Sequence, residues 1–259
     1  GDWCGWCHKL HTLFQENDEI RSLLYNEYEL VMIDTDAPNA EEYLRESSKE
    51  YERVGYPFLA VFDADGKFLT GQRTGPLEEG NHHDPKKVKD FLTRWRVEPR
   101  DADALVRETL SRAATEDKRV FLMFGTPTCG WCHRLEDFLA QPEIAASLEH
   151  DFLVLRVDLI RMKNGKDVIS RYRPEESQGV PWYVVLDAKG EKHGTADAAF
   201  GNIGYPFEPR EIDAFAALFE SQGKLKPEQV SVLRKGLETA ADEIRADDAK
   251  RAAAKIGRA

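Results

Sequence analysis

The chain has 259 residues, enough for two domains of ~100–150 residues rather than one small domain. Hydrophobic residues make up 41% of it, which suffices for ordinary cores and excludes a disordered chain. A formal net charge of −11 excludes the basic surface that neutralises nucleic-acid phosphates. The longest apolar runs last about five residues, far short of the ~20 that span a membrane. We therefore expect no nucleic-acid partner and no membrane span.

All four cysteines lie in two copies of one pentapeptide, Cys4-Gly-Trp-Cys-His8 and Cys129-Gly-Trp-Cys-His133. The repeat continues beyond these strings, since Pro57 and Pro181 are 124 positions apart and the flanking patterns match. A register kept over this length indicates two copies of one unit. Because no cysteine lies elsewhere, the sequence carries no structural disulfide framework.

The hydrophobic pattern of copy one predicts, in chain order, two short helices, a buried strand, a polar helix, a hairpin and a final helix. These elements are expected after the first CxxC, at Glu19–Tyr25, at Glu29–Asp34, at Pro38–Arg53, across the turn Asp63–Gly66 and from Pro85 onward. The Asp-x-x-Gly turn is typical of a hairpin, and a proline suits the first turn of a helix.

Copy two repeats this order and adds a helix and a strand in front of its CxxC. Its expected elements are Ala102–Ala114, Arg119–Phe124, a helix after the second CxxC, Pro142–Glu149, Phe152–Asp158, Lys163–Arg173, a hairpin across Asp187–Gly190 and a helix from Pro209. Copy one has no counterpart of the Arg119–Phe124 strand. We therefore expect the natural polypeptide to begin further upstream, with any signal peptide there.

The last segment, residues 227–256, carries a thin apolar stripe at three- and four-residue steps, for example Val230, Leu233 and Leu237. This spacing predicts a C-terminal helix that lies on its own domain, with a dimer or partner contact as the alternative.

A Cys-x-x-Cys at the start of a helix places both sulfurs on one turn, where they can form a disulfide. The positive helix end stabilises a thiolate on the first cysteine, so Cys4 and Cys129 are the predicted nucleophiles. The second cysteine of each pair, Cys7 or Cys132, resolves the mixed disulfide. The dithiol itself carries two electrons, so no cofactor and no metal are expected.

Trp3-Cys-Gly-Trp-Cys7 and Thr128-Cys-Gly-Trp-Cys132, followed further along the chain by Pro57 and Pro181, resemble the thioredoxin superfamily, in particular bacterial members with a CGWCH motif. The resemblance implies an α/β fold of two tandem thioredoxin-like domains, each with a central mixed sheet flanked by helices. Their expected bounds are residues 1–96, without a first strand, and 102–222, followed by the helical tail 227–256.

The resemblance also implies how substrate is bound. In the family this proline is cis and packs beside the disulfide, and the backbone next to it pairs with substrate as a short strand. Tyr56-Pro57 and Val180-Pro181 are the matching positions. Thioredoxin has a buried aspartate six residues before its first cysteine, whereas Met123 stands there in copy two. This departure leaves the direction of the reaction open.

Two further side chains in each motif are candidates for a role. Trp6 and Trp131 lie between the cysteines, where an exposed aromatic ring could stack on an incoming peptide; a ring folded over its own domain is the alternative. His8 and His133 follow on the same helix face, and a protonated imidazole there would favour the thiolate.

The sequence thus favours a thiol–disulfide oxidoreductase, acting as reductase, oxidase or isomerase on cysteine-containing proteins together with a redox partner protein. Three alternatives remain open: a non-catalytic thioredoxin-like binding or chaperone module, a c-type haem protein that uses both CxxCH motifs, and a shared zinc site. The tandem arrangement favours an extracytoplasmic location over a cytoplasmic one. The oligomeric state is not predicted.

Overall fold

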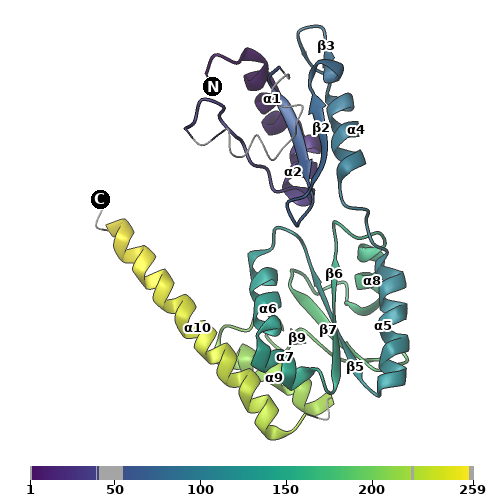
Figure 1. Ribbon diagram of the computed structural model, residues 1–259. Helices are drawn as coiled ribbons and strands as arrows, with labels where there is room; N and C mark the ends of the chain where they lie inside the picture. The colour runs from purple at the N-terminus through teal and green to yellow at the C-terminus, as the bar shows by residue number, and fades with distance from the viewer. Residues whose placement is uncertain (1, 39, 41–54, 223–224, 257–259) are drawn as a thin grey trace. The chain divides into compact units, whose positions relative to one another are not determined.

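The computed structural model describes residues 2–38, 40, 55–222 and 225–256, and the chain divides into two compact units, Gly1–Glu98 and Pro99–Ala259. Each unit contains helices packed on short strands (Figure 1). Among the residues described, no helix is both long enough and apolar enough to span a bilayer.

The second unit is built on a four-stranded mixed sheet in the order β6-β5-β7-β8, in which β6 runs parallel to β5 and the other neighbours are antiparallel. Two further short strands, β9 and β10, pair with each other. The strands are β5 (Arg119–Gly125), β6 (Phe152–Asp158), β7 (Trp182–Leu186), β8 (Lys192–Thr195), β9 (Asp197–Ala198) and β10 (Gly201–Asn202).

Helices lie on both faces of this sheet (Figure 1). Because β5 and β7 are central, their side chains are buried on both sides, which explains why both sequences are apolar runs rather than alternating patterns. The helices are α5 (Ala102–Glu116), α6 (Gly130–Ala140), α7 (Pro142–Leu148), α8 (Gly165–Tyr172), α9 (Pro209–Gln222) and α10 (Pro227–Ile256).

The core of the second unit is aromatic at its centre. Phe121 of β5 is fully buried, with its ring centroid 5.1 Å from Tyr183, 5.1 Å from Phe219 and 6.0 Å from Phe215. These rings join the two central strands to α9, and burying side chains of this size contributes about 2–3 kcal/mol each. The predicted strands and hairpin of copy two are confirmed.

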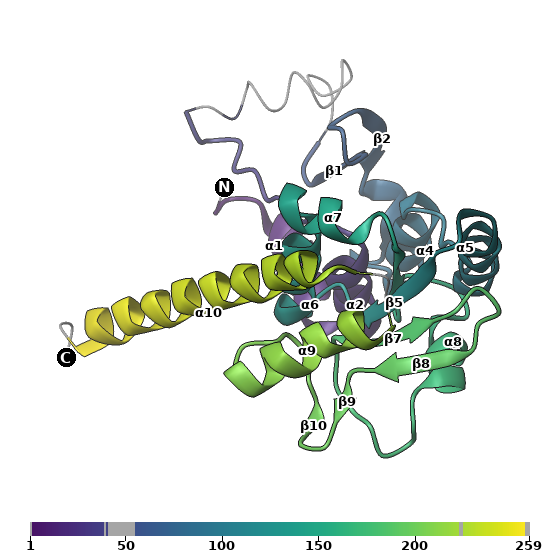
Figure 2. The ribbon, with the colours of Figure 1, turned by 90° about the horizontal axis from the view of Figure 1, so that it is seen from below.

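Helix α10 packs on α9 and α7 through its first half and extends away from them in its second half (Figure 2). Val230, Leu233 and Leu237 are buried, and Ile244 is the last buried apolar residue before residues 246–252, all of which are exposed. The predicted C-terminal helix lying on its own domain is therefore confirmed for the first half.

The first unit has the same helical order around smaller sheets. Its elements are α1 (Gly5–Glu16), α2 (Asp18–Glu27), β1 (Phe58–Phe62), β2 (Phe68–Arg73), the 3-10 turn η2 (Gly75–Leu77), β3 (Glu78–Glu79), β4 (His82–His83) and α4 (Pro85–Trp95). β1 pairs with β2 and β3 with β4. Asp84 caps the N-terminus of α4, and its side chain accepts hydrogen bonds from the backbone amides of Lys86 and Lys87.

The hairpin turns predicted from Asp-x-x-Gly form in both units. Gly66 and Gly190 have positive φ values of 78° and 83°, a conformation that glycine adopts without steric cost. The carboxylates of Asp63 and Asp187 each accept two backbone amides within their own turn.

The prediction of a strand at Glu29–Asp34 is wrong: this segment has no regular structure, and Val31 and Met32 are 72% and 65% exposed. Its counterpart β6 pairs only with β5, and the described part of the first unit contains no strand that corresponds to β5. Without a neighbour to accept its hydrogen bonds, an apolar segment forms no ladder. Most of the predicted polar helix Pro38–Arg53 falls outside the described residues.

Candidate active site

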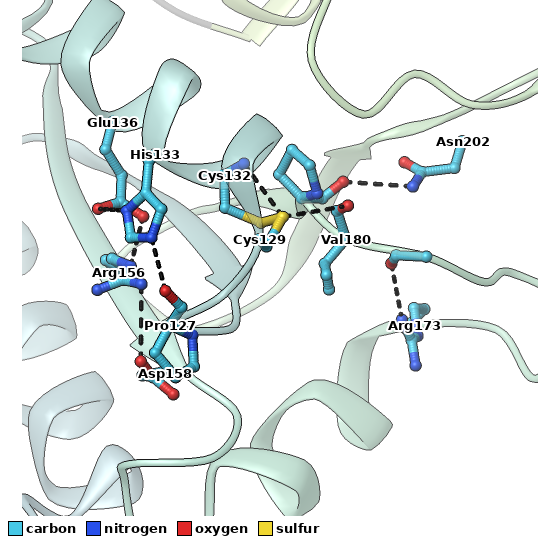
Figure 3. The surroundings of a disulfide bond; sticks show 12 residues. Pro127, Cys129, Cys132, His133, Glu136, Arg156, Asp158, Arg173, Val180 and Asn202 are labelled. Atoms are coloured by element: carbon cyan, nitrogen blue, oxygen red, sulfur yellow. Dashed lines mark hydrogen bonds and ion pairs between the residues drawn. A yellow bond between two sulfur atoms is a disulfide. The ribbon is translucent and has the colours of Figure 1, made fainter. Parts of the chain in front are cut away.

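The disulfide of the second unit lies at the N-terminus of α6. Cys129 caps this helix, and the backbone amide of Cys132 donates to Cys129 Sγ at 3.1 Å (Figure 3). An N-terminal amide that points at a sulfur, together with the positive end of the helix, stabilises negative charge on it. The local geometry therefore favours a thiolate on Cys129 when the disulfide is open.

The two sulfurs of this pair differ in burial. Cys132 is fully buried, whereas Cys129 is partly exposed. Strand β5 covers the inner cysteine, since a Cβ placed on Gly125 would lie 3.1 Å from Cys132 Sγ. An incoming substrate can therefore reach Cys129 before Cys132.

The loop before β7 brings the predicted proline to the disulfide. The Val180–Pro181 peptide bond is cis, as the sequence predicts, and the Val180 carbonyl oxygen lies 3.6 Å from Cys129 Sγ (Figure 3). Asn202 Nδ2 donates to the Pro181 carbonyl at 3.2 Å, and Arg173 donates to the carbonyl of Gly179 at 3.2 Å. These two bonds fix the loop on either side of Val180.

A polar cluster lies beside the disulfide in Figure 3. His133 Nε2 lies 2.7 Å from the Pro127 carbonyl, so this nitrogen carries the proton and donates. His133 Nδ1 lies 3.8 Å from a carboxylate oxygen of Glu136, whose other oxygen is 2.6 Å from Arg156 Nε. Arg156 also faces the buried Asp158 at 3.6 Å. Burial raises the pKa of the Glu136 carboxyl above its usual 4.5, against the opposing charge of Arg156.

The first unit repeats the helix N-terminus but not its surroundings. The amide of Cys7 donates to Cys4 Sγ at 3.2 Å, and His8 Nε2 donates to the Asp2 carbonyl at 3.1 Å. Here, however, Cys4 is buried and Cys7 is partly exposed, the reverse of the second unit.

The Tyr56–Pro57 peptide bond is also cis, as predicted. Thr74 Oγ1 donates to the Pro57 carbonyl at 3.1 Å, and the ring of Tyr56 lies edge-on to Trp3 at 5.9 Å. Trp3 is 63% exposed, so an exposed aromatic ring precedes Cys4 and lies against the proline loop.

The tryptophan between the cysteines meets different residues in the two units. The Trp131 ring lies 5.4 Å from Tyr205 and 6.4 Å from Phe207. Trp6 instead lies edge-on to His83 at 5.2 Å, with Lys9 Nζ 4.3 Å above its ring. Each tryptophan therefore packs partly on its own unit, and its stacking on a substrate peptide stays a prediction.

His83 is buried, and neither of its ring nitrogens has a hydrogen-bond partner among the described residues. Burial lowers the pKa of this imidazole below its usual 6.5. The sequence motifs did not single out this residue. His83 and Phe207 are equivalent positions of the two copies, and this difference in residue type was the signal available in the sequence.

Sequence reasoning also missed Glu136, Arg156 and Tyr205. Arg156 and Tyr205 come close to the site only through folding, whereas Glu136 lies three residues after His133 on α6, a spacing that could have identified it. Within the described ranges, no group of three or more His, Cys, Asp or Glu side chains is arranged to hold a metal ion. The assigned roles of the cysteines, the two tryptophans, the proline loops and the two motif histidines stay predictions.

The fold and the disulfide of the second unit define a thioredoxin-type α/β domain, and comparison with known proteins agrees. Residues 106–199 match the family described as Thioredoxin-like domain. The match lies within the second unit and identifies it as a thioredoxin-like domain.

Individual relatives are distant. The chain is 24% identical over 258 residues to protein disulfide-isomerase 1 of Dictyostelium discoideum, a match that covers 96% of this chain and 68% of the relative. It is 30% identical over 93 residues to spermatogenesis-associated protein 20 of Homo sapiens, covering 36% of this chain and 12% of the relative. The crystal structure of a disulphide isomerase from Xylella fastidiosa Temecula1 has 24% identity and a TM-score of 0.34, covering 37% of this chain and 72% of that one.

Proposed function

We propose that the chain is a thiol–disulfide oxidoreductase that exchanges disulfides with cysteine-containing proteins through its two CGWC pairs. The observation that carries the proposal is the second unit's arrangement: a partly exposed Cys129 sulfur that accepts a helix N-terminal amide and lies 3.6 Å from the Val180 carbonyl, with Cys132 buried behind it. The similarity to proteins named disulfide isomerases supports the same chemistry.

In the reducing direction, the Cys129 thiolate attacks one sulfur of a substrate disulfide, forms a mixed disulfide and releases the other substrate sulfur as a thiolate. Cys132 then loses its proton and attacks Cys129 Sγ, which closes the Cys129–Cys132 bond and releases the second substrate thiol. Two electrons pass from the dithiol to the substrate. The oxidising direction is the same sequence in reverse.

The remaining residues would act on binding and on the thiolate. Val180 and Pro181, with Tyr56 and Pro57 in the first unit, offer backbone beside each disulfide to an extended substrate. Trp131 and Trp6 offer an aromatic ring on which a substrate peptide can stack. His133 and His8 hold the backbone at the N-terminus of the motif helix or favour the thiolate of its first cysteine. In the first unit we assign the attack to Cys4, whose sulfur accepts the helix amide.

The test is reduction of a peptide that contains one disulfide, with dithiothreitol as the electron source, by the full chain and its serine variants. Cys129→Ser should lower the rate of the second unit about 100-fold or more, because no other group replaces the sulfur. Combining Cys4→Ser with Cys129→Ser should abolish exchange. Ser170→Ala, an exposed change on α8, is the matched control.

The separate Cys4→Ser, Cys7→Ser and Cys129→Ser variants show which unit works and whether Cys4 or Cys7 attacks in the first. Undiminished exchange by the variant that carries both Cys4→Ser and Cys129→Ser would exclude catalysis by the CGWC pairs. A folded wild-type chain that binds the peptide without exchanging its disulfide would indicate a binding module instead.

The proposal keeps the extracytoplasmic location expected from the tandem arrangement, since exchange with secreted substrates takes place where disulfides persist. Fractionation of cells that express the full-length natural gene tests this location. Recovery of the protein in the cytosolic fraction would contradict it.

A further inference from the structure

An aromatic surface lies next to the disulfide of the second unit. Trp131, in the same helical turn as both sulfurs, is 47% exposed and stacks on Tyr205 with an interplanar angle of 31°. Phe207 extends the same surface and is partly exposed. The Arg134 guanidinium lies 5.3 Å from the Trp131 ring and borders the surface with positive charge.

The C-terminal helix α10 contacts this surface at Phe207. The Arg245 guanidinium of α10 lies 4.6 Å from the Phe207 ring, and Arg245 Nη2 donates to the Phe207 carbonyl at 3.1 Å. Asp242, one turn earlier, accepts from Arg245 Nη1 at 3.1 Å and orients the guanidinium. Ile244 is buried, so the backbone that carries Arg245 is anchored. A helix far from the cysteines in sequence thus fixes the loop that faces Trp131.

Tyr205 forms the inner part of this surface. Burial raises the pKa of the Tyr205 phenol above its usual 10.0, and the nearby carboxylate of Glu243 adds to this shift. Tyr205 is itself buried, so it serves as the rigid base on which the exposed Trp131 ring rests.

The first unit lacks this surface, although its scaffold is the same. In the repeat register, Asn81 and His83 stand where the second unit has Tyr205 and Phe207. Asn81 Oδ1 accepts from Lys9 instead of presenting a ring. The difference lies in the residues that face the motif tryptophan rather than in the motif.

We propose that Trp131, Tyr205 and Phe207 bind an aromatic side chain adjacent to the reactive cysteine of the substrate, with Arg245 as the residue that positions this surface. The inference rests on the proposed function and adds its substrate class: cysteine-containing segments with a neighbouring aromatic residue. An exposed ring beside the sulfur stacks on such a side chain, whereas it gains little from a small polar one. The arginine border also disfavours basic neighbours.

The experiment compares two peptides, each with one disulfide, that differ only in phenylalanine or serine next to the cysteine. The enzyme is the full chain carrying Cys4→Ser and Cys7→Ser, so that only the second unit reacts. We expect kcat/KM to favour the phenylalanine peptide about 10-fold, a factor that aromatic stacking of ordinary strength supplies. The preference should arise from KM.

Arg245→Gln and Phe207→Ser should each reduce this preference to about 2-fold or less. For Arg245→Gln, whose side chain positions the surface without binding the substrate, kcat for the serine peptide and the reduction potential of Cys129–Cys132 should stay unchanged. A merely structural role would move all three together. Arg251→Gln, an exposed change further along α10, is the matched control. Trp131→Ala removes an exposed ring without opening the core, so it keeps the test decisive if Arg245→Gln unfolds.

If Arg245→Gln, Phe207→Ser and Trp131→Ala all keep the 10-fold preference, or if the parent chain shows none, the inference is wrong while the proposed function stands. If the parent chain exchanges neither peptide, the proposed function fails instead.

Discussion

The two units share a local structure and differ in its surroundings. In each unit the motif helix begins with a disulfide, and the sulfur of its first cysteine accepts a backbone amide. Each motif histidine donates to the carbonyl two residues before that cysteine. These features depend only on a few consecutive residues at a helix N-terminus. The burial of the second cysteine depends on the strand behind it: Cys132 lies against Gly125 of β5, whereas Cys7 is partly exposed.

The comparison shows that a motif alone does not determine which sulfur is accessible. In the second unit, β5 pairs with β6 on one side and with β7 on the other, so it fixes both the core and the floor of the disulfide site. The described part of the first unit has no such strand, and Leu30–Ile33 is exposed there. The chemistry of the two pairs is therefore expected to differ although their sequences are identical.

The largest expected effect comes from removing a ring at the aromatic centre of the second unit's core. Phe121→Ala should destabilise that unit by about 3–5 kcal/mol, because it removes a fully buried ring that contacts three others. Phe62→Ala in β1, whose ring is 39% exposed, should cost less than about 1 kcal/mol. Urea denaturation, with hydrogen exchange to assign each transition to its unit, measures both. Equal losses would contradict the expectation that the burial of each ring sets the cost of its removal.

A smaller effect tests the contact between β5 and the inner cysteine. Gly125→Ala places a Cβ 3.1 Å from both Cβ and Sγ of Cys132, so one of them must shift, at a cost of about 1–3 kcal/mol. The reduction potential of Cys129–Cys132 should change, and that of Cys4–Cys7 should not. Gly130→Ala is the control, since nothing lies within 4 Å of its added Cβ. If the reduction potentials of both pairs stay equal to wild type, the contact with β5 does not set the potential of Cys129–Cys132.

The next effect is a pH dependence confined to the first unit. Burial lowers the pKa of His83, so the unfolded chain binds a proton more readily than the folded one as the pH falls through about 6.5. The first unit should therefore lose stability below this pH and keep it above. His83→Phe, which introduces the residue type found at Phe207, should remove that acid sensitivity. Urea midpoints measured across this range test it; an unchanged acid profile in the variant would contradict the prediction.

The sequence predicted the parts of the site that are set locally or by the repeat. The CGWC turns and the hairpins at Gly66 and Gly190 each follow from a few adjacent residues. The cis bonds before Pro57 and Pro181 follow from the resemblance to the thioredoxin superfamily, carried over through the repeat register. The strand predicted at Glu29–Asp34 failed because pairing depends on a neighbour, and apolar composition alone does not supply one.

The aromatic surface around Trp131 could not be predicted for a related reason. Tyr205 and Phe207 lie near Trp131, and Arg245 contacts Phe207 from a still later segment. No hydrophobic periodicity within these two segments predicts a contact with the CGWC motif. A comparison of the two copies does point there, since Phe207 and His83 occupy one register position with different chemistry. Internal repeats thus identify specificity positions by where they disagree.

The smallest expected effect separates two roles for the motif histidine. His133→Ala removes the 2.7 Å bond to the Pro127 carbonyl and should cost about 1 kcal/mol, seen as faster hydrogen exchange in residues 126–129. His8→Ala should cost less, because its bond to Asp2 is longer at 3.1 Å. His133→Gln supplies an amide donor but no titratable ring. If the histidine holds the loop, glutamine restores the protection; if it tunes the thiolate, the pH dependence of Cys129 alkylation changes equally in both His133 variants.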